Sequence, residues 1–292
     1  MEARKILIVG ASGRVGRSLL QQLLATSNPP SIRVSTRNRE KATFPSNVEV
    51  VQGNLEDTSS YPELFNAVDR AFIYANPRTR LPQLLSAAKD GNVQYIVLLS
   101  SMTVEFDPKS DIGKAHVNAE NAIKESGIAY TFIRPRNFSS NTCLFWAPIM
   151  ERTGKLWMTY PRSQTAPVSE DDIAAVALVA LTTGKLHNQA VPLCGPISIS
   201  QQEQVEAINR LRQREGKKPI DLIILPPEEW KAKMMSWRKD DFDPIFADQL
   251  IAWWKENEDR PELIQSSERI TGRPSQSYEE WLELNKDAFL KD

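Results

Sequence analysis

The sequence predicts an α/β fold in which a doubly wound parallel sheet is joined to a smaller, mostly helical C-terminal lobe. Three observations predict it. In the first half of the chain, short runs rich in Val, Ile and Leu alternate with helix-like segments, a pattern typical of βαβ units with buried parallel strands and right-handed crossovers. A glycine-rich turn follows the first run directly, and from Pro227 onward the pattern is almost wholly helical.

The strands of this sheet are expected at the apolar runs Lys5–Gly10, Ser31–Arg37, Val48–Gly53, Arg70–Ala75, Val93–Ser101 and Gly127–Pro135. Apolar residues at helical spacing predict the intervening helices at Arg14–Thr26, Ser59–Val68, Leu81–Asp90 and Asp111–Glu125. In such a sheet, ligands bind outside the carboxyl ends of the strands, where the strand order reverses.

Three further elements are predicted beyond Pro135. Ser169–Thr183 is a helix with a serine N-cap and an acidic first turn. Ser200–Arg214 is a second helix, and Pro219–Leu225 is a strand. We expect two domains: residues 1–150, with residues 165–195 packing back onto them, and a helical lobe of residues 196–292.

Composition excludes several classes of protein. The 292 residues carry a net charge of -1, so no electrostatic attraction to nucleic acid or to an anionic membrane is expected. No apolar stretch approaches the roughly 20 residues of a membrane span. Cys143 and Cys194 are expected to be separate thiols in a cytoplasmic protein, a monomer or homodimer. Two histidines and two distant cysteines make no metal site.

The first predicted strand leads into Gly10-Ala-Ser-Gly-Arg-Val-Gly16, which opens the first predicted helix. In this context Gly10 permits a tight turn, Gly13 lets the backbone approach a pyrophosphate, and Gly16 allows close packing of helix on strand. The helix N-terminus then offers N–H groups to an anion. The spacing differs from the Gly-x-Gly-x-x-Gly of the dehydrogenase fingerprint, and the alternative is a plain strand–turn–helix. The context favours a Rossmann-type dinucleotide site.

The end of the second strand indicates which dinucleotide is bound. An acidic residue there accepts the ribose 2′-hydroxyl of NAD, whereas an arginine suits the 2′-phosphate of NADP. Here the strand ends at Arg37, and no acid precedes Glu40. A guanidinium pairs with a phosphate bidentately. We therefore predict NADP(H), held by Arg37 with help from Arg14 or Arg39; the alternative is a solvated basic turn.

These residues resemble the NmrA-like group of atypical short-chain dehydrogenases, from Lys5 to about Thr183. The landmarks are the glycine loop, Arg37, Gly53-Asn-Leu55, Val97-Leu-Leu-Ser-Ser101, His116-Val-Asn-Ala-Glu120, Ser126–Pro135 with Phe138 and Asn141, and Val168-Ser-Glu-Asp-Asp172. A second set, Leu98–Glu105, His116 and Thr271–Trp281, is similar to the festuclavine dehydrogenase-type branch. That resemblance implies NADPH-dependent reduction of iminium or conjugated bonds in secondary metabolism, as in alkaloid biosynthesis.

The resemblance also implies site residues. Contacts with the cofactor are implied for Gly10, Ser12, Gly13, Arg14, Val15, Gly16 and Arg37, with Asn54 and Leu55 near the adenine. Ala75, Asn76 and Pro77 would lie by the ribose and nicotinamide, and Ser100 and Ser101 by the nicotinamide. Phe138 and Asn141 would border the substrate cleft.

The sequence lacks the tyrosine–lysine pair that typical short-chain dehydrogenases use as a proton donor. Typical short-chain dehydrogenases use Tyr-x-x-x-Lys, in which the tyrosine hands a proton to a carbonyl oxygen. None of the six tyrosines here has a lysine four residues on. An iminium substrate needs no such proton, because its cationic nitrogen accepts the electrons while the protein positions the reactants.

Ser101, Lys114 and His116 are the candidate catalytic residues. A histidine titrates near neutral pH and can donate a proton. Each residue has a plainer alternative: a serine that caps the backbone, a solvated lysine and a structural histidine. The apolar segments Leu144–Met150 and Leu156–Tyr160 suggest a substrate wall that includes Trp157 and Tyr160. The alternative for both segments is core between the lobes.

The sequence thus predicts an NADPH-dependent reductase of a small, largely apolar iminium, imine or conjugated metabolite. Two alternatives stay open. One is a cofactor-bound cyclase or isomerase with little net redox chemistry. The other is a non-catalytic NADP(H)-sensing regulator.

Overall fold

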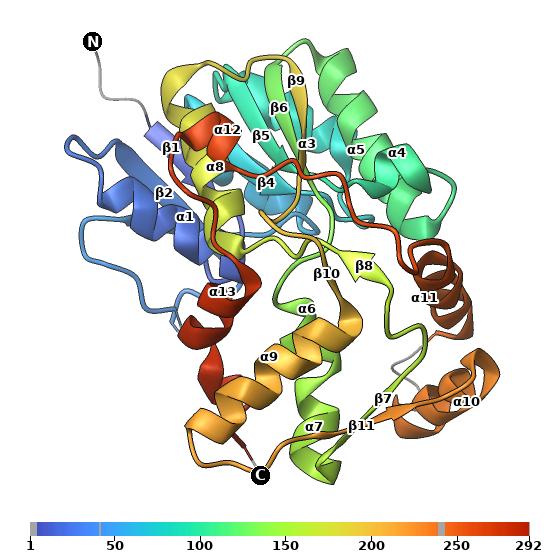
Figure 1. The fold of residues 1–292 in the computed structure, drawn as a ribbon. Coiled ribbons are helices and arrows are strands. Elements are labelled where there is room, and N and C mark those ends of the chain that lie inside the picture. The colour runs from blue at the N-terminus through green and yellow to red at the C-terminus, as the bar shows by residue number, and fades with distance from the viewer. Residues whose placement is uncertain (1–4, 41, 239–242, 292) are drawn as a thin grey trace. The chain divides into compact units, whose positions relative to one another are not determined.

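The computed structural model describes residues 5–40, 42–238 and 243–291, which form two compact units (Figure 1). Unit 1 comprises the described residues up to Arg136, with Glu170–Leu193 and Ser267–Pro274. Unit 2 comprises the remaining described residues, namely Asn137–Ser169, those between Cys194 and Ser266, and those from Ser275 onward. None of the helices in the described part of the chain has the length and apolar character of a membrane span.

Unit 1 is built on a seven-stranded sheet whose pairings are all parallel. The strand order is β3-β2-β1-β4-β5-β6-β9, so it reverses between β1 and β4. The strands are β1 (Lys5–Ile8), β2 (Ser31–Thr36), β3 (Glu49–Gln52), β4 (Arg70–Tyr74), β5 (Tyr95–Leu99), β6 (Ala129–Pro135) and β9 (Gln189–Leu193). This is the predicted doubly wound α/β fold, and in folds of this kind dinucleotides bind at the switch point.

The helices of unit 1 cover this sheet. They are α1 (Arg14–Leu24), α2 (Tyr61–Phe65), preceded by the 3-10 turn η1 (Thr58–Ser60), α3 (Leu81–Asp90), α4 (Thr103–Phe106), α5 (Asp111–Ser126), α8 (Glu170–Thr183) and α12 (Glu268–Thr271). α1 packs against α8, while α2 packs on α3 and α3 on α5. Residues of α2, α3 and α5 bury a common core against the strands, including Leu64, Leu84 and Ile123.

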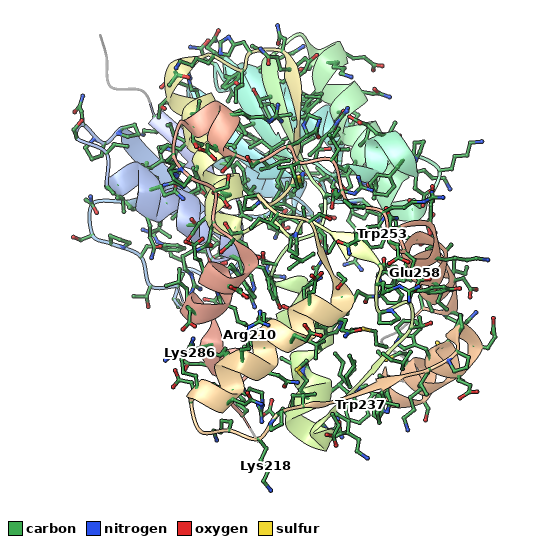
Figure 2. The ribbon with its side chains drawn as sticks, viewed as in Figure 1. Arg210, Lys218, Trp237, Trp253, Glu258 and Lys286 are labelled. Carbon is green, nitrogen blue, oxygen red and sulfur yellow. The ribbon has the colours of Figure 1, made fainter. Side chains whose placement is uncertain are left out.

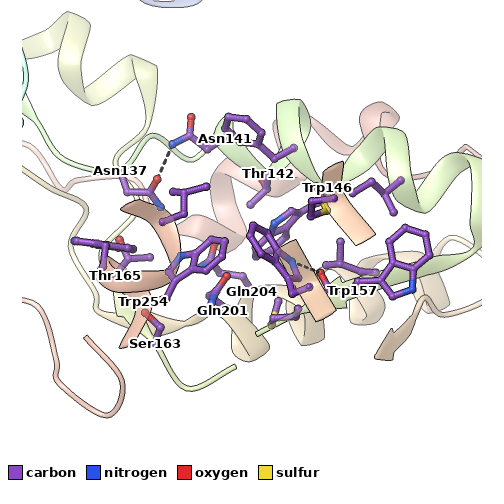
Figure 3. A pocket seen from close by; sticks show the side chains of 18 residues that line it. Asn137, Asn141, Thr142, Trp146, Trp157, Ser163, Thr165, Gln201, Gln204 and Trp254 are labelled. Atoms are coloured by element: carbon purple, nitrogen blue, oxygen red, sulfur yellow. Dashed lines mark hydrogen bonds between the residues drawn. The ribbon is translucent and has the colours of Figure 1, made fainter. Parts of the chain in front are cut away.

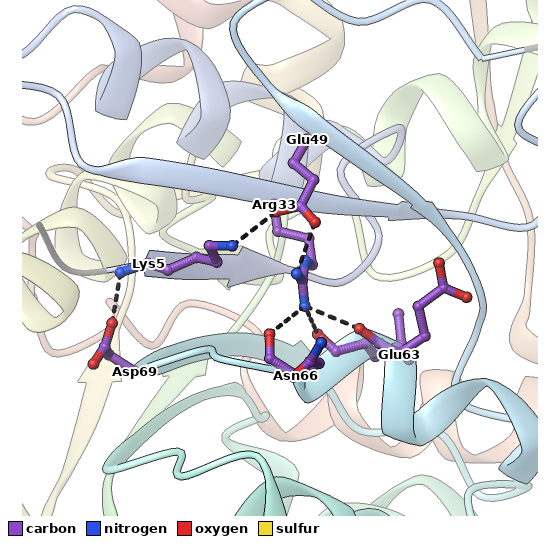
Figure 4. Close-up of polar contacts among 7 residues, drawn as sticks. Lys5, Arg33, Glu49, Glu63, Asn66 and Asp69 are labelled. Atoms are coloured by element: carbon purple, nitrogen blue, oxygen red, sulfur yellow. Dashed lines mark hydrogen bonds and ion pairs between the residues drawn. The ribbon is translucent and has the colours of Figure 1, made fainter.

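A buried arginine organises the amino ends of the first strands (Figure 4). Arg33 donates hydrogen bonds to the carbonyl oxygens of Glu63 (2.9 Å) and Asn66 (2.7 Å), at the end of α2. It also pairs with Glu49 at 2.7 Å, and its hydrogen bond holds the pKa of that carboxyl below its ordinary value. Lys5 joins the same carboxylate at 3.1 Å. These bonds fix β2 and β3, whose other ends lead to the predicted cofactor residues.

Unit 2 contains helices α6 (Asn141–Phe145), α7 (Ala147–Thr153), α9 (Gln201–Arg214), α10 (Pro227–Arg238), α11 (Pro244–Glu256) and α13 (Tyr278–Leu284), and the 3-10 turn η3 (Lys286–Ala288). Two small sheets accompany them: β7 (Lys155–Met158) pairs with β11 (Asp221–Ile224), and β8 (Gln164–Thr165) pairs with β10 (Ile199–Ser200). Capping boxes at Ser200 and Ser277 begin α9 and α13. Lys286, which Figure 2 labels, pairs with Glu215 at 2.9 Å.

The division into units differs from the expected boundary at residue 150. Residues 137–150 belong to unit 2 because Ile149 and Met150 of α7 pack in one apolar cluster with Ile208 of α9 and Trp281 of α13. Near the C-terminus, Ser267 returns the chain to unit 1, where its hydroxyl donates to Asp172 at 2.8 Å.

Two local expectations also differ from the structure. The strand β9 was not expected, because Gln189 and Pro192 interrupt its apolar pattern, and an edge strand tolerates both. The helical pattern after Pro227 is broken at residues 258–266, which form no helix. Asp259 there has a φ of 56°, and Pro261 follows, so the helix α11 cannot continue.

Candidate functional site

The glycine loop joins β1 to α1 in unit 1. Gly10 has a φ of 79°, which favours glycine, and its carbonyl accepts the N–H of Gly13 at 2.9 Å. A Cβ on Gly16 would lie 2.3 Å from the Gly10 oxygen, so only glycine lets α1 approach the strand so closely. Gly13 caps α1 with no side-chain hydrogen bond. The uncapped N–H groups of α1 therefore fit a pyrophosphate.

The exposed side chains of the loop, Ser12 and Arg14, lie at the helix start, whereas Val15 is buried. Arg17 bonds back to the Ser12 carbonyl at 3.3 Å. The loop thus has a fixed backbone and two exposed side chains next to the helix N-terminus.

Arg37 follows β2 directly and is exposed, as is Arg39. The charge of Arg37 acts on Glu56, whose pKa is lowered mainly by a hydrogen bond from Asn76 and also by Arg78 at 3.4 Å. Residues that follow β2, β3 and β4 therefore gather at the carboxyl edge of the sheet. This edge is cationic, with two arginines beside one carboxylate.

The other predicted adenine and ribose residues lie along the same edge. Asn54 accepts the backbone N–H of Glu56 at 2.7 Å. Leu55 is buried in the core with 1% of its surface exposed, so its side chain lies beneath the edge. Ala75 continues the pairing of β4, since its N–H donates to Leu99 at 3.3 Å, and Pro77 is exposed.

A buried ion pair fixes the end of β5. The Ser100 hydroxyl donates to Glu120 of α5 at 2.6 Å, and Glu120 accepts from Arg134 of β6 at 2.9 Å and 2.5 Å. Glu120 is 1% exposed. Arg134 also pairs with Glu105 at 2.6 Å, and these carboxylates, Glu120 above all, raise its pKa. The network holds the Ser100 side chain in one position.

The three candidate catalytic residues occupy different environments. Ser101 is half-buried, and its Oγ accepts the N–H of Thr103 at 3.2 Å, as in the backbone-capping alternative. Lys114 is exposed and lies 3.6 Å from Asp111. The Nδ1 of His116 is buried without a partner in the described residues. Burial lowers the His116 pKa, against the opposing charge of Glu120. The lowered pKa favours the neutral imidazole over the charged form.

Unit 2 contains an apolar pocket (Figure 3). Five of the seven tryptophans of the chain line it: Trp146, Trp157, Trp230, Trp253 and Trp254. The Trp230 indole N–H donates to the Trp157 carbonyl at 3.1 Å, and the Trp230 and Trp254 rings meet edge to face with centroids 4.9 Å apart. Hydrogen bonding and ring packing thus fix the indole wall.

The polar groups of the pocket are all uncharged. They are Asn137, Asn141, Thr142, Ser163, Thr165, Gln201 and Gln204. Asn141 donates to Asn137 at 2.6 Å (Figure 3). Of the 18 described residues that line the pocket, none has an ionisable side chain.

The structure brings together some of the predicted substrate residues. Asn141 and Trp157 line the pocket, whereas Phe138 and Tyr160 are not among its described lining residues. Phe138 instead forms a backbone bridge with Val168. Gln201 and Trp230 of this pocket were not predicted from the sequence, because an amide at a helix start and a helical tryptophan are typical of ordinary structure. Within the described residues, no group of three or more His, Cys, Asp and Glu is placed to hold a metal ion.

Comparison with known proteins agrees with the geometry of unit 1. A family model described as NAD(P)H-binding matches residues 10–183. The (4-alkanoyl-5-oxo-2,5-dihydrofuran-3-yl)methyl phosphate reductase of Streptomyces griseus subsp. griseus is 30% identical, covering 98% of this chain and 100% of the relative. An NAD(P)H azoreductase of Xenophilus azovorans is 24% identical, covering 97% and 99%.

Among solved structures, the triphenylmethane reductase of Citrobacter sp. complexed with NADP(H) is similar in fold. Its TM-score is 0.77 at 20% identity, and the match covers 96% of this chain and 99% of that one. The names of these relatives favour neither the cyclase nor the sensor alternative, and none of these three names points to the festuclavine dehydrogenase-type branch.

Proposed function

Since the chain belongs to the NAD(P)H-binding family, within the NmrA-like, atypical short-chain dehydrogenases, we propose that it is an NADPH-dependent reductase of a planar, largely apolar compound. The bond reduced is an electron-poor C=N bond or a C=C bond conjugated to an acceptor. The observation that carries this proposal is the pocket of unit 2, with five indole rings and no ionisable lining residue in the described chain.

The glycine loop and Arg37 are the residues that would hold the cofactor. The uncapped start of α1 binds the pyrophosphate, and Arg37 pairs with the 2′-phosphate, since no acidic residue lies between Thr36 and Glu40. The cofactor, when bound, supplies a hydride. This arrangement supports a preference for NADPH over NADH.

The pocket supports a substrate that is flat and uncharged, or whose positive charge is spread over its ring system. Indole faces attract aromatic rings and delocalised cations. They offer nothing to a localised anion. The Streptomyces relative is named for a phosphate ester, but no lysine or arginine is among the described residues of this pocket. We therefore propose a substrate without a phosphate or carboxylate group.

The described lining of the pocket has no acidic side chain, which supports reduction of a C=N or conjugated C=C bond rather than of an isolated ketone. Reduction of an isolated ketone requires a proton donor at the carbonyl oxygen, and no lining residue of the described chain supplies one at neutral pH. Hydride addition turns an iminium ion into a neutral amine and a conjugated enone into an enolate that solvent protonates, while an imine reaches the iminium state by taking a proton from solvent. The iminium and imine substrates implied by the festuclavine-type resemblance meet this requirement.

A spectrophotometric panel tests the proposal. Purified protein is mixed with NADPH and a cyclic imine, its N-methyl iminium salt, an aryl enone, or a phosphorylated analogue of the enone. We expect stoichiometric loss of NADPH absorbance with members of the first three classes and none with the phosphate. Turnover of the phosphorylated compound as fast as its parent contradicts the proposed substrate class. Product formation without NADPH consumption contradicts the proposed reaction.

A further inference from the structure

Ser163 presents an unused hydrogen-bond donor in the pocket of unit 2. The residue lines the pocket with 1% of its surface exposed, and its Oγ has no hydrogen-bond partner within the described residues. Buried polar groups in proteins are nearly always hydrogen-bonded, so an exception in a ligand pocket requires an explanation. A ligand atom that accepts the hydroxyl proton provides one.

The backbone around Ser163 is held in place, which gives the hydroxyl a defined position. The Ser163 N–H donates to the Tyr160 carbonyl at 2.9 Å, and the Ser163 carbonyl accepts the N–H of Gln201 at 3.0 Å. The Gln201 side chain also donates to the carbonyls of Thr159 and Tyr160, each at 3.0 Å. The start of α9 thus clamps the turn that carries Ser163, even though Tyr160 has a φ of 50°.

The two other hydroxyl groups among the described lining residues already donate hydrogen bonds within the protein. The Thr165 hydroxyl donates to Glu262 at 3.4 Å, and the Thr142 hydroxyl donates to the Ser139 carbonyl at 2.8 Å. Figure 3 shows Ser163 beside Gln201 and Thr165, at the opposite side of the pocket from Trp157. Trp254 is drawn on the same side as Ser163, so a ligand ring that lies against the indoles can place an acceptor atom at the Ser163 hydroxyl.

We propose that Ser163 selects the ligand by donating a hydrogen bond from its Oγ to a neutral acceptor atom, a carbonyl oxygen or an imine nitrogen, of an aromatic molecule whose ring lies against the indoles. This inference rests on the proposed function and narrows its substrate class. An acceptor with a lone pair satisfies the Ser163 hydroxyl, whereas a fully alkylated iminium ion binds without this hydrogen bond and is a weaker ligand. Ser163 is thus a specificity-determining residue, and it leaves the redox step unchanged.

The matched ligands 1-tetralone and tetralin test this role, since they differ by one carbonyl oxygen. Their dissociation constants are measured by titration calorimetry on the protein saturated with NADP⁺, where no turnover occurs. In Ser163→Ala we expect 1-tetralone to bind roughly 5- to 10-fold more weakly, the value of one hydrogen bond. Tetralin should bind the variant as tightly as the wild type or more tightly.

Ser139→Ala is the matched control, because Ser139 is also 1% exposed with an unpartnered Oγ but is not among the described lining residues. Both ligands should bind this control as they bind the wild type. Unchanged 1-tetralone binding in Ser163→Ala overturns the proposal, and so does equal weakening of both ligands or a similar loss in Ser139→Ala.

A measurement on the wild-type protein removes any dependence on the folding of a variant. The infrared carbonyl stretch of bound, ¹³C-labelled 1-tetralone should lie at lower wavenumber than in an alkane solvent. A frequency equal to that in the alkane overturns the proposal. Because these readouts need no NADPH oxidation, they can succeed where the reductase panel fails and fail where it succeeds.

Discussion

Replacing Glu120 with Gln should loosen unit 1 at the predicted nicotinamide end of its sheet. Glu120 is 1% exposed and accepts hydrogen bonds from Ser100 and twice from Arg134, whose side chain is 11% exposed. The variant leaves a buried guanidinium facing a neutral amide, and breaking a buried ion pair in this way costs about 3–5 kcal/mol. Because Arg134 keeps its ion pair with Glu105, we expect the free energy of unfolding of unit 1 to fall by about 3 kcal/mol, the lower end of this range.

Hydrogen exchange is the suitable assay, because all seven tryptophans lie in unit 2 and their fluorescence does not report on unit 1. Amides of β5 and β6 that exchange through opening of unit 1 should do so about 150-fold faster in Glu120→Gln, the factor equivalent to 3 kcal/mol. Glu105→Gln is the control: it removes the 45% exposed partner of the same arginine and should cost less than about 1 kcal/mol. Equal acceleration in the two variants refutes the reasoning.

Three further outcomes follow from the geometry of unit 1. Gly16→Ala, whose Cβ would lie 2.3 Å from a backbone oxygen, should lower the melting temperature clearly more than Gly13→Ala, whose Cβ would lie at 3.2 Å; equal melting temperatures contradict the close approach. Burial lowers the His116 pKa, so below about pH 6.5 the unfolded chain binds the proton more readily than the folded one, and the free energy of unfolding falls. Denaturant titrations at pH 7.5 and 5.5 should show a smaller fall in His116→Gln than in the wild type. An equal fall in the two proteins contradicts this prediction. Arg37→Glu should raise the dissociation constant of NADPH by about 10-fold or more without weakening NADH, as measured by calorimetry, and retained NADPH affinity refutes the 2′-phosphate role.

The sequence predicted the parts of the molecule that follow from local pattern. The fold class, NAD(P)H binding and membership of the oxidoreductases are confirmed. The runs that predicted six strands hold β1 to β6, and α3 has the predicted bounds, because buried strands and amphipathic helices leave their period in the sequence. The predicted carboxyl ends of β1 to β5 extend one to two residues too far, into the loops that carry the candidate cofactor residues, whereas that of β6 at Pro135 is confirmed.

The pocket of unit 2 could be predicted from the sequence only in small part. Its lining comes from segments as distant as Asn137 and Trp254, and only the tertiary structure brings them together. Asn141 was predicted from the family resemblance, and Trp157 was predicted from the apolar segment Leu156–Tyr160. The buried, unpartnered hydroxyl of Ser163 has no sequence signal, since the same residue elsewhere caps a helix or a turn. The roles of all the named site residues stay predictions.

In the proposed reaction, NADPH delivers a hydride to carbon in a flat substrate that carries no anionic group. Single turnovers with NADPH deuterated at either C4 position, followed by mass spectrometry of the product, test it most directly. We predict that an imine or enone gains one carbon-bound deuterium from one of the two labelled cofactors and none from the other. A product that lacks deuterium with both cofactors contradicts hydride transfer from NADPH to carbon.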